Sequence, residues 1–344
     1  MSLDATLQRL ETTPLLGSGW DQVATGLFKL RGHLQDEGKD TVLRVILLDA
    51  GLRSASPAED PVPFLASAER WARGQELELG AIQLCLQWCQ HVGRVDPGAV
   101  PDAVRAQAVA GAQADGTLEA EWRLALSVGH PDDIRLLTEA LAHLDAPHHA
   151  HSRLQVRMDL AAAHLQGGDV PAAVDHLLAA QAIADTHDAD LPSLRIASML
   201  GQLRLVQGLP DRARPHLQRA LSLAQELGDD LALLTQASLL AGVQLGAGEW
   251  TEASATAALQ IPAAQRRSAW LAVADGTISQ STCALKQDDA TSAVALLVQR
   301  SRQMRGQAPI AAMHLLQARL AELRVWLGDV VFDPLLAAAL TAPD

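Results

Sequence analysis

Residues 192–230 read PSLRIASMLGQLRLVQGLPDRARPHLQRALSLAQELGDD, the pattern of two helices joined by a short turn. The turn is Gly208-Leu209-Pro210, because glycine accepts the backbone conformation that ends a helix and proline suits the first turn of the next one. Similar turns recur at a spacing of forty residues: Gly168-Asp169, Gly248-Glu249 and Gly328-Asp329. The missing member of the series falls at Asp288. A fixed period of this kind is typical of a solenoid, in which each unit buries its apolar face against its neighbours.

Two further columns keep the same register. An alanine stands five residues after each turn glycine, where a small side chain lets the second helix lie close to the first: Ala173, Ala213, Ala253 and Ala293. An apolar residue stands three positions before each turn: Leu165, Leu205, Leu245, Leu285 and Val325. Columns that hold their register over successive units indicate true repeats.

These columns resemble the tetratricopeptide repeat (TPR). In the unit that matches best, the residues that carry the resemblance are Gly201, Gly208, Ala213 and Ala220. The longer period of forty residues is similar to that of repeats in the sensor regions of bacterial regulators. The resemblance covers residues 151–344 and departs from the family at its aromatic positions, since the chain contains no tyrosine. It implies an all-α fold, a right-handed solenoid of antiparallel helix hairpins, and a role in binding proteins or peptides.

The sequence predicts two parts. Residues 1–113 are expected to form a divergent helical N-terminal half, and residues 114–344 a TPR-like repeat array. The predicted hairpins cover residues 117–145, 151–188, 192–228, 231–265, 269–305 and 309–342.

Composition excludes several functions. The net charge is −13, from 27 basic and 40 acidic residues, and no cluster of Lys and Arg is present, so nucleic acid is not expected as a direct partner. No apolar run approaches the ~20 residues that span a bilayer, and the N-terminus lacks the pattern of a signal peptide. We therefore expect a cytoplasmic protein that does not enter a membrane. No cofactor-binding motif occurs, so no cofactor is expected.

Cysteines and histidines are the candidates for site chemistry. Cys85 and Cys89 lie one helical turn apart among apolar neighbours, which favours packing in the core. The densest polar cluster is His143, His148, His149 and His151. Imidazoles placed close together bind zinc, copper or nickel, but a polar loop around Pro147 is the favoured interpretation. Whether this cluster binds a metal stays open.

The repeat register also places a set of polar side chains on one surface. In repeats of this kind the first helix of each hairpin lines the concave face. The positions that point there hold Gln155, Met158, Gln166, Arg195, Ser198, Gln202, Thr235, Ser238 and Lys286. Trp326 also falls on this face, although packing is the favoured role for a tryptophan. We predict a groove for an extended peptide or a helix, with a merely solvated surface as the alternative.

The C-terminal stretch VVFDPLLAAALTAPD leaves almost no polar face on a final helix from about Pro334. Its apolar residues include Phe332, Leu335, Leu336 and Leu340. A solenoid needs a polar outer face on its last helix, and the preceding hairpin is not expected to cover this surface alone. Either the helix folds back onto the groove or it packs against another copy, and we predict a homodimer.

The function predicted from these features is a non-catalytic scaffold or adaptor that binds a protein or peptide in its concave groove. The first alternative is a ligand-responsive sensor that binds a peptide or a small molecule. The second alternative is an enzyme with a site in the N-terminal half, although no catalytic motif is present. A deep pocket there, with converging carboxylates and histidines, would favour the enzyme, whereas an open polar face would favour the binding module.

Overall fold

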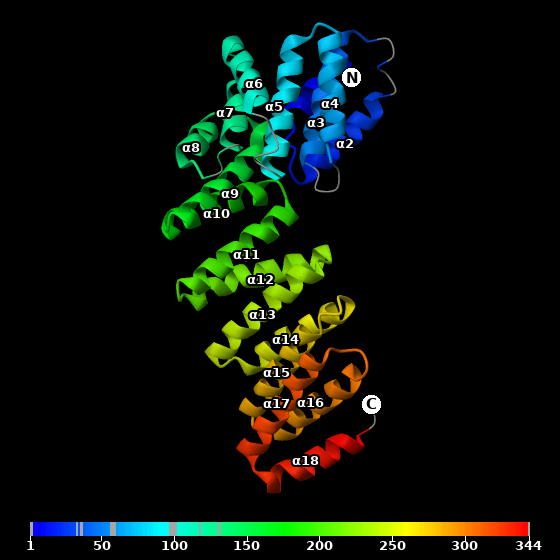
Figure 1. The fold of residues 1–344 in the computed structure, drawn as a ribbon, viewed down its shortest axis with the longest axis vertical. Helices are drawn as coiled ribbons and strands as arrows, with labels where there is room; N and C mark the ends of the chain where they lie inside the picture. The colour runs from blue at the N-terminus through cyan, green and yellow to red at the C-terminus, as the bar shows by residue number, and fades with distance from the viewer. Residues whose placement is uncertain are drawn as a thin grey trace. The chain divides into compact units, whose positions relative to one another are not determined.

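The computed structural model describes residues 3–31, 34, 37–55, 60–95, 102–116, 118–128, 130 and 132–342. Within these residues every regular element is a helix and no strand occurs, which confirms the predicted all-α fold (Figure 1). The chain divides into two compact units, residues 1–196 and 197–344, which we describe separately. The predicted boundary after residue 113 marks where the repeats begin along the sequence, and it stays a prediction.

Unit 1 consists of helices of 9 to 18 residues and one short 3₁₀ helix. Their bounds are α1 Leu3–Thr12, α2 Ser18–Arg31, α3 Lys39–Ala55, α4 Val62–Gly74, α5 Glu78–Val95, α6 Asp102–Asp115, α7 Glu119–Val128, α8 Ile134–Ala142, η1 Pro147–His149, α9 Ala150–Gln166 and α10 Val170–Thr186. Helix α11, Asp190–Val206, begins in unit 1 and ends in unit 2.

The packing of unit 1 closes on itself. Helix α3 packs on α5, α5 on α7, α7 on α8 and α8 on α9. The short helix η1, which precedes α9, in turn contacts α1 at the start of the chain. Separate apolar clusters hold these neighbours together, with Leu7 and Leu27 between α1 and α2, and Leu137 and Leu160 between α8 and α9. The two ends of the unit are therefore neighbours, and the helices surround an interior space.

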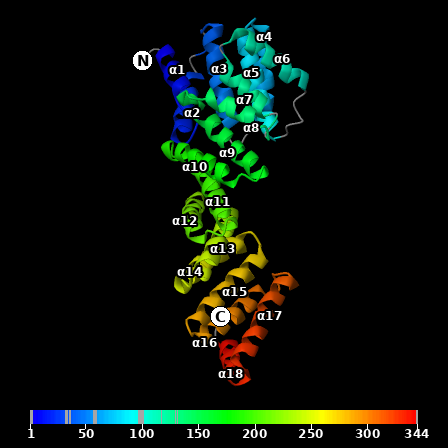
Figure 2. The ribbon, with the colours of Figure 1, turned by 90° about the vertical axis from the view of Figure 1, so that its left-hand side faces the viewer.

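Unit 2 is a stack of helix hairpins. Its helices after α11 are α12 Pro210–Leu227, α13 Asp230–Ala247, α14 Trp250–Arg266, α15 Trp270–Lys286, α16 Ala290–Met304, α17 Ile310–Leu327 and α18 Asp329–Thr341. Each helix from α12 to α16 packs on the next one along the chain, and α17 packs on α15, α16 and α18 (Figure 2). Each hairpin range predicted from residue 151 onward overlaps two of the observed helices, with ends that differ by at most two residues.

The turns repeat at half the predicted period. Left-handed backbone occurs every twenty residues, at Gly168, Asp188, Gly208, Gly228, Gly248, Ser268 and Asp288. After each of these residues the next amide donates to the carbonyl five residues back, as from Asp169 to His164 at 2.8 Å and from Asp289 to Ala284 at 2.9 Å. This is the hydrogen bond of a Schellman helix end. Asp288, with φ of 60°, thus adopts the conformation of the glycine that the forty-residue series lacks.

The C-terminal helix corrects one expectation. Helix α18 packs on α16 and α17, and the Phe332 side chain is only 3% exposed in the core that these helices form. Leu335 and Leu336 are half-buried against the same core, whereas Leu340 is half exposed. The expectation that the preceding hairpin would leave this face uncovered is therefore wrong for Phe332. The dimer itself stays a prediction.

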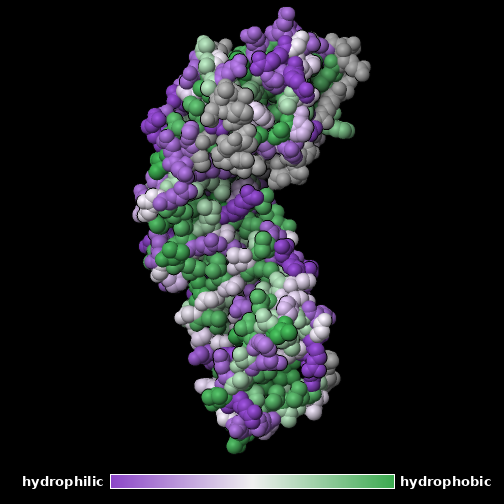
Figure 3. Space-filling view, viewed as in Figure 1, coloured by the Kyte–Doolittle hydropathy of each residue, from purple (hydrophilic) through white to green (hydrophobic). Residues whose placement is uncertain are grey.

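Exposed apolar side chains instead gather near the turn between α17 and α18. Trp326 is 69% exposed, so the packing role that the sequence favoured for it is wrong. Val325 and Val330 beside it are 86% and 90% exposed. Figure 3 shows hydrophobic surface at this end of unit 2. No helix in the described part of the chain is both long and apolar enough to span a membrane.

Candidate functional site

Unit 1 contains a cavity of about 910 Å³ that is partly open to solvent. One side is formed by α1 to α3 and the loop between α1 and α2, which contribute Glu11, Leu16, Gly17, Trp20, Arg44, Leu48 and Ser54. Helices α5 and α7 contribute Gln83, Gln87, Gln90, His91, Glu121 and Leu124. The remaining side comes from η1, α9, the turn before α11 and the start of α11, with His148, His149, His151, Gln155, Met158, Asp188, Asp190 and Arg195. The closed packing of unit 1 thus brings together residues from both ends of that unit.

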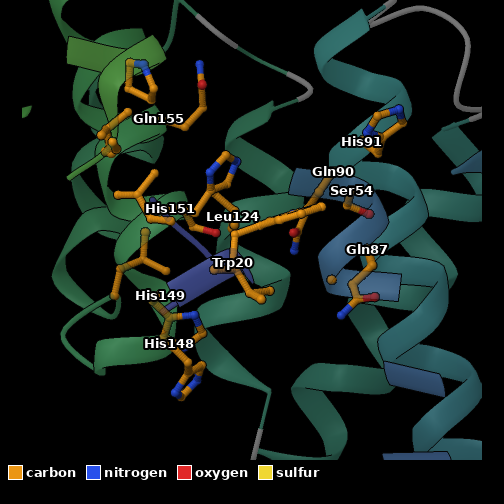
Figure 4. Close-up of a pocket in the computed structure, with 18 of the residues that line it drawn as sticks. Trp20, Ser54, Gln87, Gln90, His91, Leu124, His148, His149, His151 and Gln155 are labelled. Carbon is orange, nitrogen blue, oxygen red and sulfur yellow. The ribbon is translucent and has the colours of Figure 1, made fainter. Parts of the chain in front are cut away.

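Helix α5 presents a row of amide side chains to this cavity. Gln83, Gln87 and Gln90 share one face of the helix, because they are spaced by four and then three residues. The Gln90 Nε2 donates a hydrogen bond of 3.0 Å to the backbone oxygen of Glu121, which ties α5 to α7. The Gln87 Oε1 is buried and accepts no hydrogen bond from the described residues. Figure 4 shows Ser54, Gln87, Gln90 and His91 on the same side of the cavity.

Two more oxygen-bearing side chains, Ser54 and Glu121, line the cavity on this side. The Ser54 Oγ is buried without a hydrogen bond to any described residue. The Glu121 carboxylate has no cation within ion-pair distance in the described part of the chain, and burial raises its pKa above the ordinary value. By contrast, the cavity-lining Glu11 is held by the Arg44 guanidinium, with Nε–Oε1 and Nη2–Oε2 distances of 2.6 and 2.7 Å.

His148, His149 and His151 line the opposite side (Figure 4). The rings of His148 and His149 lie 4.0 Å apart between centroids and are tilted by 49°. Burial lowers the pKa of His148, and burial together with the charges of His148 and Arg153 lowers the pKa of His149 to about 4. His149 is therefore neutral at neutral pH, and each neutral imidazole offers one donor and one acceptor nitrogen.

The structure brings part of the predicted groove and part of the histidine cluster to this one cavity. Gln155, Met158 and Arg195 line it from α9 and α11, together with His148, His149 and His151. His143 does not line it, and its Nε2 lies 3.7 Å from the Glu119 Oε1. Among the described residues, no group of three or more His, Cys, Asp or Glu side chains is arranged to hold a metal ion.

The other predicted groove residues do not line the cavity. They are Gln166, Ser198, Gln202, Thr235, Ser238, Lys286 and Trp326. The Ser198 Oγ accepts a hydrogen bond of 2.7 Å from the Gln236 Nε2, and the Lys286 ammonium lies 5.9 Å from the centre of the Trp250 ring. Gln202, Thr235 and Ser238 are exposed. A partner surface formed by these residues stays a prediction.

The side of the cavity that the N-terminal half forms was not predicted from the sequence. The Trp20 Nε1 donates to the Leu52 carbonyl at 3.2 Å, and the Trp20 ring lines the cavity. The glutamines of α5 carried a signal, because three amides on one face of an apolar helix are unusual for a buried element. Ser54 and Glu121 carried no signal in the sequence, because single polar residues are common on helices.

A second cavity of about 620 Å³ in unit 1 holds Cys85. The predicted core role is right for Cys89, which is 1% exposed in an apolar cluster, while Cys85 packs at its edge. A hydrogen bond with Cys89 lowers the pKa of the Cys85 thiol. The Arg73 guanidinium, which also lines this cavity, pairs with Glu69.

No family model matches this chain, and no curated protein matches it. Its fold is similar to that of the apo form of the quorum sensor NprR from B. thuringiensis, with 15% identity and a TM-score of 0.51 over 98% of this chain and 97% of that chain. The apo form of RapI gives 13% identity and a TM-score of 0.49, over 94% and 98% of the two chains. A Rap protein complexed with Competence and Sporulation Factor gives 15% identity and a TM-score of 0.46, over 94% of this chain and 98% of that chain. Identities this low concern the fold, and the chain has a TPR-like helical repeat fold of the kind seen in a bacterial quorum sensor.

Proposed function

We propose that this chain is a peptide-binding regulatory protein without a catalytic step, and that a short peptide occupies the cavity of unit 1. The observation that carries the proposal is the set of buried oxygen atoms of Gln87 and Ser54, which line the cavity and have no partner among the described residues. Buried polar atoms in folded proteins are nearly always paired, so such atoms in a cavity indicate a ligand that supplies the partner.

The lining suits a peptide. Amide side chains such as those of Gln83, Gln87 and Gln90 offer both donors and acceptors, as a peptide backbone does. Apolar side chains, including Trp20, Leu48, Leu124 and Met158, alternate with these polar groups around the cavity. A volume of about 910 Å³ lies within the range of small-ligand sites, so a peptide of a few residues fits better than a folded domain. The fold shared with the quorum sensor NprR supports a regulatory role for such binding.

A second candidate function is enzymatic, and one observation favours it. Glu121, with its raised pKa, lines the same cavity as neutral histidines, and perturbed titrating groups in a cavity are typical of catalysis. Two contacts favour binding instead. Glu11 is held by Arg44, and within the described residues no base lies within hydrogen-bond distance of the Ser54 hydroxyl to activate it. We therefore rank the enzyme second.

The test is selection from a synthetic library of random hexapeptides, with protein-bound peptides isolated by size exclusion and identified by mass spectrometry. Two variants make the same change at different places. Gln155→Trp fills part of the cavity, whereas Gln202→Trp adds the same ring to an exposed position of unit 2. We expect the wild type and Gln202→Trp to retain the same peptides, and Gln155→Trp to retain at least tenfold less. Equal retention by both variants, or no retention by the wild type, would overturn the proposal, and recovery of cleaved or altered peptides would establish the enzyme.

A further inference from the structure

Three neighbouring helices of unit 1 offer acceptor atoms to the cavity. The Ser54 Oγ and the Gln87 Oε1 lack a hydrogen bond among the described residues, and the Glu121 carboxylate forms no ion pair with them. Ser54 lies on α3, Gln87 on α5 and Glu121 on α7, and α5 packs on both other helices. All three residues line the cavity, and we call them the acceptor wall. The Gln90 side chain donates to the Glu121 backbone, so its amide group fixes α7 against α5 and leaves the Glu121 carboxylate for other partners.

The arginines on two helices of the acceptor wall are paired with carboxylates other than Glu121. Arg44 on α3 binds Glu11 and Asp4, with Nη1 2.5 Å from the Asp4 Oδ1. Arg123 on α7 binds Glu119 at 2.8 Å and Glu139 at 3.3 Å. Among the described residues, Glu121 joins neither of these networks. An ionised carboxylate removed from water is costly unless a charged partner accompanies it.

The atoms of the acceptor wall define the group that would satisfy them. Gln87 Oε1 and an ionised Glu121 are acceptors, and the Ser54 hydroxyl can rotate to accept as well. A primary ammonium carries three N–H donors and one positive charge, which matches three acceptors and one carboxylate. Hydrogen bonds in which both groups are charged are shorter and stronger than neutral ones.

We infer that the peptide proposed for this cavity is anchored by a primary ammonium group at the acceptor wall of Ser54, Gln87 and Glu121. This inference rests on the proposed function and adds the chemistry of the ligand. The ammonium has two sources in a peptide, the free N-terminus and a lysine side chain. The neutral histidines and the apolar residues on the other sides of the cavity then contact the uncharged remainder of the peptide.

Three synthetic hexapeptide libraries separate these sources. One has a free N-terminus and no lysine, one is N-acetylated without lysine, and one is N-acetylated with a single lysine. The full-length protein should retain peptides from the first or the third library at least tenfold more than from the second. Preference for the first identifies the N-terminus as the anchor, and preference for the third identifies lysine.

Matched variants locate the effect at the acceptor wall. Glu121→Gln keeps the shape of the side chain and removes its charge, so it should cut the retention of amine-bearing peptides about tenfold and abolish the preference among libraries. Glu119→Gln makes the same change two residues earlier on α7, where the carboxylate pairs with Arg123, and should keep the preference. Gln87→Met removes one acceptor and leaves Glu121 in place, so it should reduce the retention of amine-bearing peptides about threefold. This variant replaces Glu121→Gln as the test if Glu121→Gln fails to fold.

The outcomes separate this inference from the proposed function. Equal retention of the acetylated, lysine-free library by the wild type overturns the ammonium anchor but leaves a peptide-binding protein. A preference that persists in Glu121→Gln also overturns it. Retention from none of the libraries overturns the proposed function and this inference together.

Discussion

Gly17, in the loop between α1 and α2, lies directly against the carbonyl group of His187, which follows α10. A Cβ atom at Gly17 would overlap the His187 carbonyl oxygen, and the backbone of Gly17 is left-handed, with φ of 56°. Glycine alone meets both requirements without strain. This contact places the N-terminal loop against the turn before α11, and residues on both sides of it line the cavity.

The first prediction is that Gly17→Ala destabilises the protein by about 3 kcal/mol, through left-handed strain and the displacement of the His187 backbone. The matched control is Gly116→Ala. Gly116 is also left-handed, with φ of 74°, but a Cβ there meets nothing within 4 Å, so the loss should be about 1 kcal/mol. Unfolding in urea measures both. Equal losses of unfolding free energy in the two variants would show that the His187 backbone moves aside for a methyl group without a measurable cost.

The second prediction concerns the turn that lacks a glycine. Asp288 holds a left-handed conformation that costs a residue with a side chain about 1 kcal/mol. Asp288→Gly should therefore raise the melting temperature of unit 2, while Gly248→Ala, at the preceding hairpin turn, should lower it. A lower melting temperature for Asp288→Gly would mean that the aspartate side chain stabilises this turn by more than the backbone strain costs.

These turns show how far the sequence determines the fold. Gly168, Gly208 and Gly248 reveal the repeat because glycine is the residue that a left-handed helix end prefers. Asp188 and Ser268 adopt the same left-handed conformation between hairpins. Aspartate and serine are common in other conformations, so these residues did not indicate a helix end and the twenty-residue period was not predicted.

The site was less predictable than the fold, for a physical reason. The register predicted Gln155, Met158 and Arg195, because positions within one repeat follow from the helical period. The partners of these residues in the cavity, Trp20 and Gln87, come from helices that lie more than sixty residues earlier in the chain. Which distant helices meet is decided by tertiary packing, and no local pattern encodes it.

The third prediction is a loss of stability on acidification. The pKa of His149 is lowered to about 4 from 6.5, first by burial. Between these two values the unfolded chain binds a proton at His149 that the folded chain does not, so the stabilisation is full above pH 6.5 and is lost as the pH falls towards 4. The free energy of unfolding should therefore fall over this window, and less steeply in His149→Gln. The control is His314→Gln, at an exposed position of unit 2. Identical slopes for His149→Gln and the wild type would contradict the argument.

The fourth prediction concerns self-association through the C-terminal end. The side chains of Trp326, Val330 and Leu340 are exposed, and apolar patches of this kind mark contact surfaces. We expect the protein to sediment as a dimer at micromolar concentration and the double variant Val330→Asp, Leu340→Asp to sediment as a monomer. Val206→Asp, an equally exposed valine on α11, is the control and should leave the dimer intact. A wild-type protein that remains monomeric at every accessible concentration would contradict the predicted dimer.

The final prediction distinguishes the cavity from the predicted groove as the place where a peptide binds. Arg195 lines the cavity in unit 1, whereas Gln202, seven residues later on the same helix, is exposed in unit 2. Arg195 offers five N–H donors to the carbonyl and carboxylate oxygens of a peptide. With a peptide obtained from the hexapeptide library, Arg195→Ala should weaken binding about tenfold, or about 1.4 kcal/mol.

Gln202→Ala should leave the affinity for that peptide within about twofold of the wild type, a change of about 0.4 kcal/mol. Isothermal titration calorimetry measures the affinities, and thermal unfolding checks that both variants fold, as expected for substitutions of exposed residues. If Gln202→Ala weakens binding and Arg195→Ala does not, the peptide lies along the part of the predicted groove that belongs to unit 2. In that case the unpartnered oxygens of Gln87 and Ser54 require a different ligand.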